Sequence, residues 1–267
     1  MLNELSEEYL KRFGGIARLY GKESLRHFAR AHFCIVGIGG VGTWIAESFA
    51  RTGIGEITLI DLDEICVTNT NRQIHALTST VGQSKIDVMA RRILEINPEC
   101  KVHKIEDFIT VQNIQSHLSQ EFDYIIDAID SVKTKAAIAA YCRRNKKKFL
   151  MIGGAGGQID PTLIEVADIA KTVQDPLVSK VRSLLKSQYG VKLNNKGKFG
   201  IDTVYSKEQL RYPSVEGEIC FAKKQTEGQL KMDCSSGFGA VTMVTASFGL
   251  VAAAHVIKKF LASKNHR

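Results

Sequence analysis

Short apolar runs alternate with amphipathic stretches between residues 32 and 157. Runs rich in β-branched and aromatic residues predict buried strands, and apolar residues that recur every three or four positions predict helices. The predicted strands span 32–38, 56–61, 101–107, 124–130 and 149–157, and the predicted helices span 43–51, 84–97 and 134–144. Strands that alternate with helices pair in parallel through right-handed crossovers. The pattern therefore predicts an α/β fold with a doubly wound, mainly parallel sheet.

The regular alternation ends near residue 160. A basic amphipathic pattern over 175–190 predicts a helix, and a polar segment rich in Gly and Lys over 190–206 leads into a further strand. Residues 213–236 show little hydrophobic period, which favours a long loop. We therefore expect an N-terminal helical segment over 1–30, a nucleotide-binding domain over 31–175 and a less regular C-terminal region over 176–267, all within one globular unit.

One segment, residues 237–257, is long enough to span a bilayer and carries no formal charge. Its glycines, its hydroxyl side chains and His255 weaken the free energy of membrane insertion. We expect a buried helix in the core or in a subunit interface, and no membrane span. The N-terminal residues carry acids and no apolar core, so no signal peptide is expected. Six cysteines without a C-x-x-C pair favour reduced thiols in the cytoplasm over a structural zinc site.

The chain is basic, with 36 Lys and Arg against 28 Asp and Glu and a formal net charge of +8, which favours a polyanionic partner. The excess is concentrated in two stretches, either of which could also be a solvated face. We expect the second stretch, over 180–198, to contribute more to binding a polyanion, because it could fold over the ligand site. The first stretch, over 143–148, ends a helix whose N-terminus faces the ligand edge, so it should point away from the site. The two stretches comprise Arg143, Arg144, Lys146, Lys147 and Lys148, and Lys180, Arg182, Lys186, Lys192, Lys196 and Lys198.

The sharpest motif follows the first predicted strand and opens the next helix. It contains Gly37, Gly39, Gly40 and Gly42 in a G-x-G-G-x-G arrangement. Glycines there permit a tight turn whose backbone N–H groups approach a phosphate at the helix N-terminus. Asp61 follows Gly42 by 19 residues, where a carboxylate can accept hydrogen bonds from ribose hydroxyls. Together these features predict nucleotide binding.

The residues that follow favour ATP over a nicotinamide cofactor. Arg72 and Lys85 would neutralise triphosphate charge, and Asp130, at the end of a predicted strand, is a natural Mg²⁺ ligand. Asn69 and Gln73 lie in the same TNTNRQ segment as Arg72. A dehydrogenase would leave Arg72, Lys85 and Asp130 without a role. A protein that only senses nucleotide would have the same nucleotide-binding residues and would catalyse no reaction.

Several motifs carry a family resemblance. GIGGVG, DLDEICVTNTNRQ, GQSK, INPE and DAIDSVKTK resemble the adenylation domain of ubiquitin-activating-enzyme-like proteins. RFGGIARLYG, TNTNRQIHAL, GGAGGQIDP and MDCSSGFGAVTMVTASFG resemble the bacterial tRNA threonylcarbamoyladenosine dehydratases, over nearly the whole chain. The resemblance implies a homodimer that uses ATP and Mg²⁺ to cyclise threonylcarbamoyladenosine beside the anticodon of tRNA.

The resemblance also implies roles for single residues. It assigns the glycines and Asp61 to the nucleotide, Asn69, Arg72 and Lys85 to the phosphates, and Asp130 to the metal. Residues 1–30 would make a dimer contact, through which either Arg12 or Arg18 reaches the partner's site. A monovalent cation and a sulfur-relay partner, such as a cysteine desulfurase system, are further possibilities that it raises.

Two points stay open at the level of sequence. Cys234 is either a thioester-forming nucleophile, by analogy with ubiquitin activation, or a buried or loop thiol. The alternative substrate is the C-terminus of a sulfur-carrier or ubiquitin-like protein. Those relatives often carry two C-x-x-C zinc pairs, and this chain has none.

Overall fold

The computed structural model describes residues 5–213, 219–221 and 238–264. Its main sheet has seven strands in the order β3-β2-β1-β4-β5-β7-β6, and only β6 runs antiparallel to its neighbour. A small hairpin pairs β8 (Tyr212–Pro213) with β9 (Ile219–Cys220). The strands of the main sheet are β1 (His32–Val36), β2 (Glu56–Ile60), β3 (Lys101–Ile105), β4 (Tyr124–Asp127), β5 (Phe149–Ile152), β6 (Ile164–Asp168) and β7 (Asp202–Ser206).

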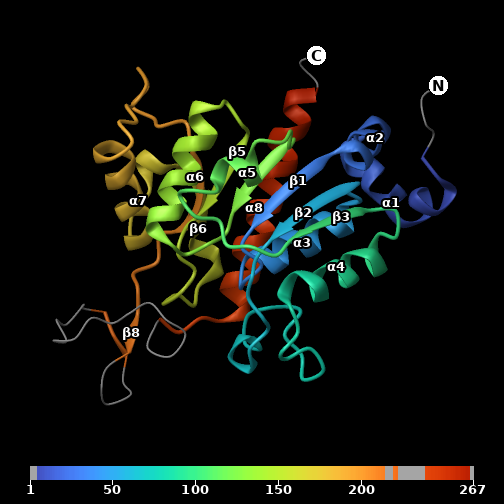
Figure 1. Cartoon of the computed structure of the whole chain (residues 1–267), viewed down its shortest axis with the longest axis horizontal. Coiled ribbons are helices and arrows are strands. Elements are labelled where there is room, and N and C mark those ends of the chain that lie inside the picture. Colours follow the sequence, from blue (N-terminus) through green and yellow to red (C-terminus); the bar gives the residue numbers. More distant parts are fainter. Residues whose placement is uncertain (1–4, 214–218, 222–237, 265–267) are drawn as a thin grey trace.

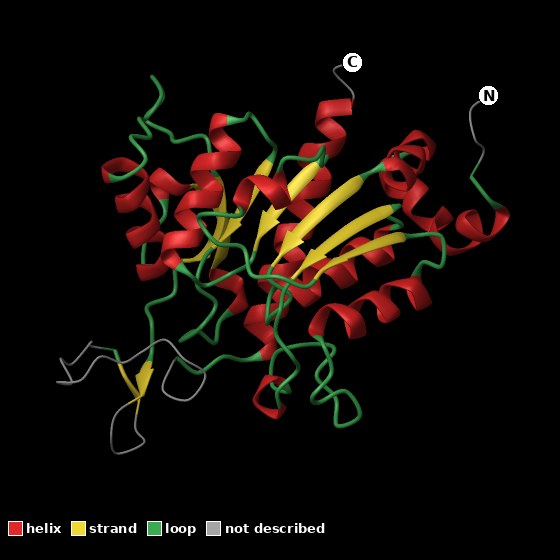
Figure 2. Ribbon diagram, in the orientation of Figure 1, coloured by secondary structure: helices red, strands yellow, loops and turns green. Residues whose placement is uncertain are grey.

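Helices cover both faces of this sheet (Figure 2). Along β1, Phe33 and Ile35 pack in the core shared with α3, α4 and α8, whereas Cys34 and Val36 pack against α5 and α6. Burial on both faces is the environment that a parallel strand requires, and it confirms the predicted doubly wound fold. The helices are α1 (Glu7–Tyr20), α2 (Lys22–Arg30), α3 (Gly42–Thr52), α4 (Lys85–Ile96), α5 (Ile114–Leu118), α6 (Val132–Arg144), α7 (Pro176–Ser187) and α8 (Thr242–Lys264).

The C-terminal third is more regular than its sequence pattern indicates. It supplies β7, an interior strand between β5 and β6, and α7, which packs on α6. All five predicted strands end earlier than expected, most of all the 124–130 run, which leaves the sheet after Asp127, and the 149–157 run, which leaves it after Ile152. Figure 1 shows α7 beyond one end of the sheet, with α1 and α2 at the other.

The expected small-residue helix is present as α8. It packs closely on α3, where a Cβ added to Gly249 would lie only 2.6 Å from Cβ of Trp44. Val244, Phe248 and Val256 are fully buried on this side, whereas Leu250 is 54% exposed on the other. By length and composition α8 is long and apolar enough to cross a membrane, a test that the core helix of a soluble protein also passes.

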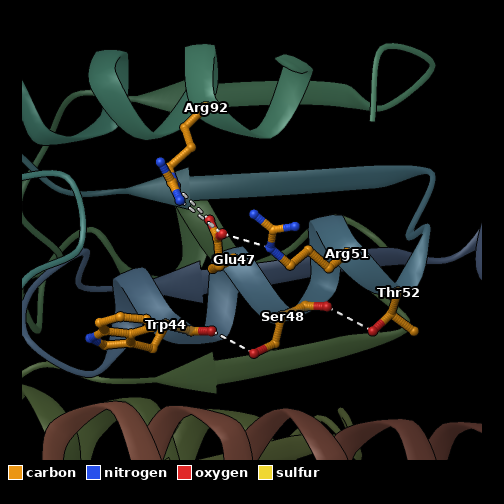
Figure 3. Close-up of polar contacts among 6 residues, drawn as sticks. All are labelled: Trp44, Glu47, Ser48, Arg51, Thr52 and Arg92. Carbon is orange, nitrogen blue, oxygen red and sulfur yellow. Dashed lines mark hydrogen bonds and ion pairs between the residues drawn. The ribbon is translucent and has the colours of Figure 1, made fainter. Parts of the chain in front are cut away.

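A buried carboxylate fastens α3 to α4 (Figure 3). Glu47 on α3 accepts hydrogen bonds at 2.7 Å and 3.0 Å from the Arg92 guanidinium on α4, and at 2.7 Å from Arg51. Burial raises the pKa of Glu47, but the bonds from Arg92 and Arg51 outweigh it, so the net shift is downward. The contact fixes the direction of both helices, which begin at the glycine turn and at Lys85.

A second buried ion pair closes the carboxyl end of β4. Lys135 on α6 and Asp127 are both inaccessible to solvent, with Nζ 3.0 Å from Oδ1. The ammonium also donates to the main-chain carbonyl of Asp127 at 3.2 Å. Burial raises the pKa of Asp127, and Lys135 opposes this rise. The pair therefore ties the start of α6 to the end of β4.

We expect Lys135→Met to destabilise the protein by about 3–5 kcal/mol, because it leaves the Asp127 carboxyl buried without its counter-ion. Chemical denaturation measures this change. Lys133→Met, at an exposed position of the same helix, is the matched control. The double variant Asp127→Leu/Lys135→Met should recover most of the loss. A Lys135→Met protein as stable as the control would contradict this account.

Candidate nucleotide site

The turn between β1 and α3 has room only for glycine at its narrowest point. A Cβ on Gly42 would lie 1.8 Å from the carbonyl oxygen of Gly37, whose own φ is +91°. No side chain caps α3, and the amides of residues 39–41 donate to no acceptor among the described residues. Free N–H groups at a helix N-terminus favour an anion. The turn is therefore shaped to receive a phosphate group.

Asp61 fixes this turn from the neighbouring strand. Its carboxylate accepts from the Ile38 amide at 2.6 Å and from the Asp63 amide at 2.9 Å. Asp63 in turn pairs with Lys85, whose Nζ lies 2.6 Å from Oδ2 and whose side chain is only 8% exposed. One chain of contacts thus connects the glycine turn to the first residue of α4.

The TNTNRQ segment packs onto the same turn. The side-chain stem of Arg72 lies 3.3 Å from the position of a Cβ on Gly40, and the Gln73 amide nitrogen lies 4.0 Å from that on Gly39. The buried Asn69 supports both residues, because its carbonyl accepts their backbone N–H groups. Oε1 of Gln73 is buried without a hydrogen-bond partner among the described residues. The segment therefore presents a cation and an unpaired polar atom beside the phosphate-binding turn.

Two elements from outside the segment hold Arg72 in place. The indole of Trp44 donates to the Arg72 carbonyl at 3.0 Å, and the Thr245 hydroxyl donates to it at 3.3 Å. Thr242 donates to the Asn71 carbonyl at 2.6 Å. The sequence does not single out Trp44, so its positioning role is missed. Its place two residues after Gly42 is the signal that could have indicated it.

Asp130 lies elsewhere than expected. The strand ends at Asp127, and Asp130 is an exposed loop residue three positions later, before α6 begins. The expectation that it ends a buried strand is therefore wrong, because the apolar run stops at 127. A Cβ on Gly37 would lie 3.0 Å from Ile129, so this loop still borders the turn. Cys234 lies outside the described residues.

His75, in the same region of the chain, is buried. Both ring nitrogens lack a hydrogen-bond partner among the described residues, although the ring lies near the Ile38 backbone. Burial, with the nearby charges of Lys85 and Arg92, lowers the pKa of His75 to about 4. The imidazole is therefore neutral near pH 7.

The loop over 192–198, which belongs to the second basic stretch, lies away from the nucleotide site. The Arg143 guanidinium donates to the carbonyls of Lys192 and Phe199, so the loop over 192–198 lies beside the C-terminal end of α6. This loop leads into β7, which runs parallel to β5 and starts at the amino edge of the sheet. The expectation that Lys192, Lys196 and Lys198 fold over the ligand site is therefore wrong for this subunit.

The chain is similar to known proteins over nearly its whole length. The ThiF family model matches residues 14–267. tRNA threonylcarbamoyladenosine dehydratase of Escherichia coli is 59% identical over 97% of this chain and 96% of its own length, and that of Haemophilus influenzae is 51% identical over 97% of each. A structure of the E. coli enzyme in complex with ATP matches with a TM-score of 0.89 at 54% identity, over 99% of both chains. The chain therefore belongs to the ThiF family and, within it, to the tRNA threonylcarbamoyladenosine dehydratases.

Proposed function

We propose that this protein uses ATP to cyclise threonylcarbamoyladenosine in tRNA by removing water. The observation that carries the proposal is the packing of Arg72 against Gly40, which places a guanidinium on the phosphate-binding turn. The relatives that match nearly the whole chain bear the name of this activity. A sulfur-carrier or ubiquitin-like protein substrate is the less favoured alternative.

The residues present suit ATP. The unpaired amides of residues 39–41 and the orphaned Oε1 of Gln73 offer polar partners, and Arg72 and Lys85 supply positive charge. The Asp61 carboxylate has lone pairs left for ribose hydroxyls after its two backbone bonds. Mg²⁺ prefers carboxylate oxygens, and the exposed Asp130 would hold it beside the turn, where the ion would neutralise phosphate charge.

The reaction needs an activated carboxylate, because a free one is a poor electrophile. The threonine carboxylate oxygen would attack the α-phosphorus of ATP and release pyrophosphate, giving an acyl adenylate. A nitrogen or oxygen of the same modification then attacks the carbonyl carbon and expels AMP, which carries away one carboxylate oxygen. Arg72 and Lys85 stabilise the charge that grows on the leaving phosphates. Proximity within the bound nucleoside supplies the ring closure without a protein nucleophile, so Cys234 need not form a thioester.

We also propose that the protein is a cytoplasmic homodimer. The outward face of α8 exposes Met243 and Leu250, by 60% and 54%, on a helix whose other face is buried in the core. An apolar stripe of this kind suits a subunit contact. Arg12 and Arg18 are both exposed on α1, where either could reach a partner.

Gly39→Val should weaken ATP binding by at least about tenfold while the protein stays folded. A Cβ at position 39 meets only the Gln73 amide nitrogen, at 4.0 Å, so a side chain can begin in the space in front of the turn without a backbone clash. Calorimetric titration with ATP measures the affinity, and thermal denaturation checks the fold. Wild-type affinity in this variant would contradict the phosphate-binding assignment.

Arg72→Ala and Lys85→Ala should each lower turnover by roughly 100-fold and change ATP affinity much less, because both cations act on charge that develops in the transition state. Steady-state and single-turnover rates separate the two effects. Arg91→Ala, at an exposed position of α4, is the control. A loss confined to ATP affinity would refute the role in the transition state.

The function itself is tested by product release from ATP with each candidate substrate. We expect pyrophosphate and AMP only with tRNA that carries threonylcarbamoyladenosine, and mass spectrometry should show the nucleoside lighter by one water. Release of phosphate and ADP would indicate an acyl phosphate instead. ATP turnover with a sulfur-carrier or ubiquitin-like protein, and no ATP turnover with modified tRNA, would overturn the proposal.

A further inference from the structure

A cluster of potential metal ligands lies at the amino edge of the sheet. His32 and Glu56 are the first residues of β1 and β2 and are paired in register, and His103 lies on β3 opposite Thr58. One ligand atom from each of the three side chains lies within 4.8 Å of the others. Three residues far apart in sequence thus converge because three parallel strands start side by side.

The distances suit a single small cation. Nδ1 of His32 lies 3.6 Å from Oε1 of Glu56, close to the ~3.4 Å that separates two ligands of tetrahedral zinc. Nε2 of His103 lies 2.7 Å from the same oxygen, which is a hydrogen bond that a metal would replace. The His103 side chain is 51% exposed and therefore has room to move. A shift of a few tenths of an ångström would bring its Nε2 to the ligand-to-ligand distance of a zinc site.

The His32 ring is held in place from its other side. Its Nε2 lies 2.8 Å from the hydroxyl of Thr58, and its ring packs edge-to-face with that of Phe122, with 4.8 Å between ring centroids. Imidazoles that bind metals usually have their second nitrogen fixed by a hydrogen bond. When Nε2 donates to Thr58, Nδ1 presents its lone pair toward Glu56 and His103.

We propose that His32, Glu56 and His103 bind one divalent transition-metal ion, with Zn²⁺ as the favoured species. Two imidazoles and one carboxylate are a ligand set of zinc sites with an open position, which the exposure of His103 allows water to fill. The ion would join the starts of β1, β2 and the edge strand β3. The site is separate from the nucleotide site, because five residues of β1, about 16 Å of strand, lie between the two edges.

Zinc titration of the metal-stripped, ATP-free protein tests the proposal, in excess Mg²⁺ and in a Cys66→Ser background that removes an exposed thiol. We expect one site per chain, with His103→Ala weakening it by at least about tenfold and Thr58→Val by about 10- to 100-fold. His117→Ala is the matched control, since His117 pairs with a single carboxylate, Asp107, at 2.7 Å.

Co²⁺ absorption provides a second readout, because tetrahedral coordination by nitrogen and oxygen gives intense visible bands, whereas the octahedral aqua ion absorbs only weakly and at shorter wavelength. These bands should appear in the wild type and in His117→Ala, and disappear in His103→Ala and Glu56→Gln. His103 is half exposed, so its replacement should keep the chelator-treated melting temperature. Equal zinc affinity and equal Co²⁺ spectra in His103→Ala and the wild type would overturn the proposal. ATP affinity should not change in any of these variants.

Discussion

The approach of Gly42 to the carbonyl of Gly37 is the constraint on which the ligand edge depends. Because no Cβ fits between them, only glycine at position 42 allows the chain to turn directly from β1 into α3, and the amides of residues 39–41 have no acceptor in the part of the chain that the structure describes. Asp61 then holds the Ile38 amide, which ties the turn to β2 and, through Asp63, to Lys85 on α4. A phosphate cradle and a buried cation are therefore parts of one connected structure.

The C-terminal helix completes this structure from the other end of the chain. α8 can approach α3 only because residue 249 is glycine, and this contact brings Thr242 and Thr245 to the carbonyls of Asn71 and Arg72. The Arg72 carbonyl also accepts a hydrogen bond from the indole of Trp44 on α3. Two distant parts of the sequence thus fix the backbone of Arg72 and leave its side chain beside the glycine turn.

The sequence predicted the parts of the fold that depend on local periodicity and short-range motifs. The parallel strands, α3, α4 and the glycine turn follow from patterns within twenty residues. In the structure, contacts connect that turn to Asp61, Asn69, Arg72, Gln73 and Lys85.

The remaining features depend on tertiary contacts that no local pattern encodes. Asp127 and Asp130 look equivalent in the DAID motif, and only the buried Lys135 shows that the first is structural. The loop over 192–198 looked free to cover the ligand, but its position follows from bonds to Arg143 on another helix. Likewise, the metal-ligand cluster appears only once the register of β1, β2 and β3 is known.

The position of α1 decides which nucleotide site an arginine on this helix can reach. Tyr9 donates to the carbonyl of Gly53, and Phe13 also packs against this glycine, which follows the C-terminal end of α3. The glycine turn lies at the opposite end of that 11-residue helix, about 16 Å away. Arg12 precedes the anchored Phe13 and therefore lies near the end of α3 that is far from the glycine turn. A phosphate contact by Arg12 would therefore require the nucleotide site of a second copy of the chain.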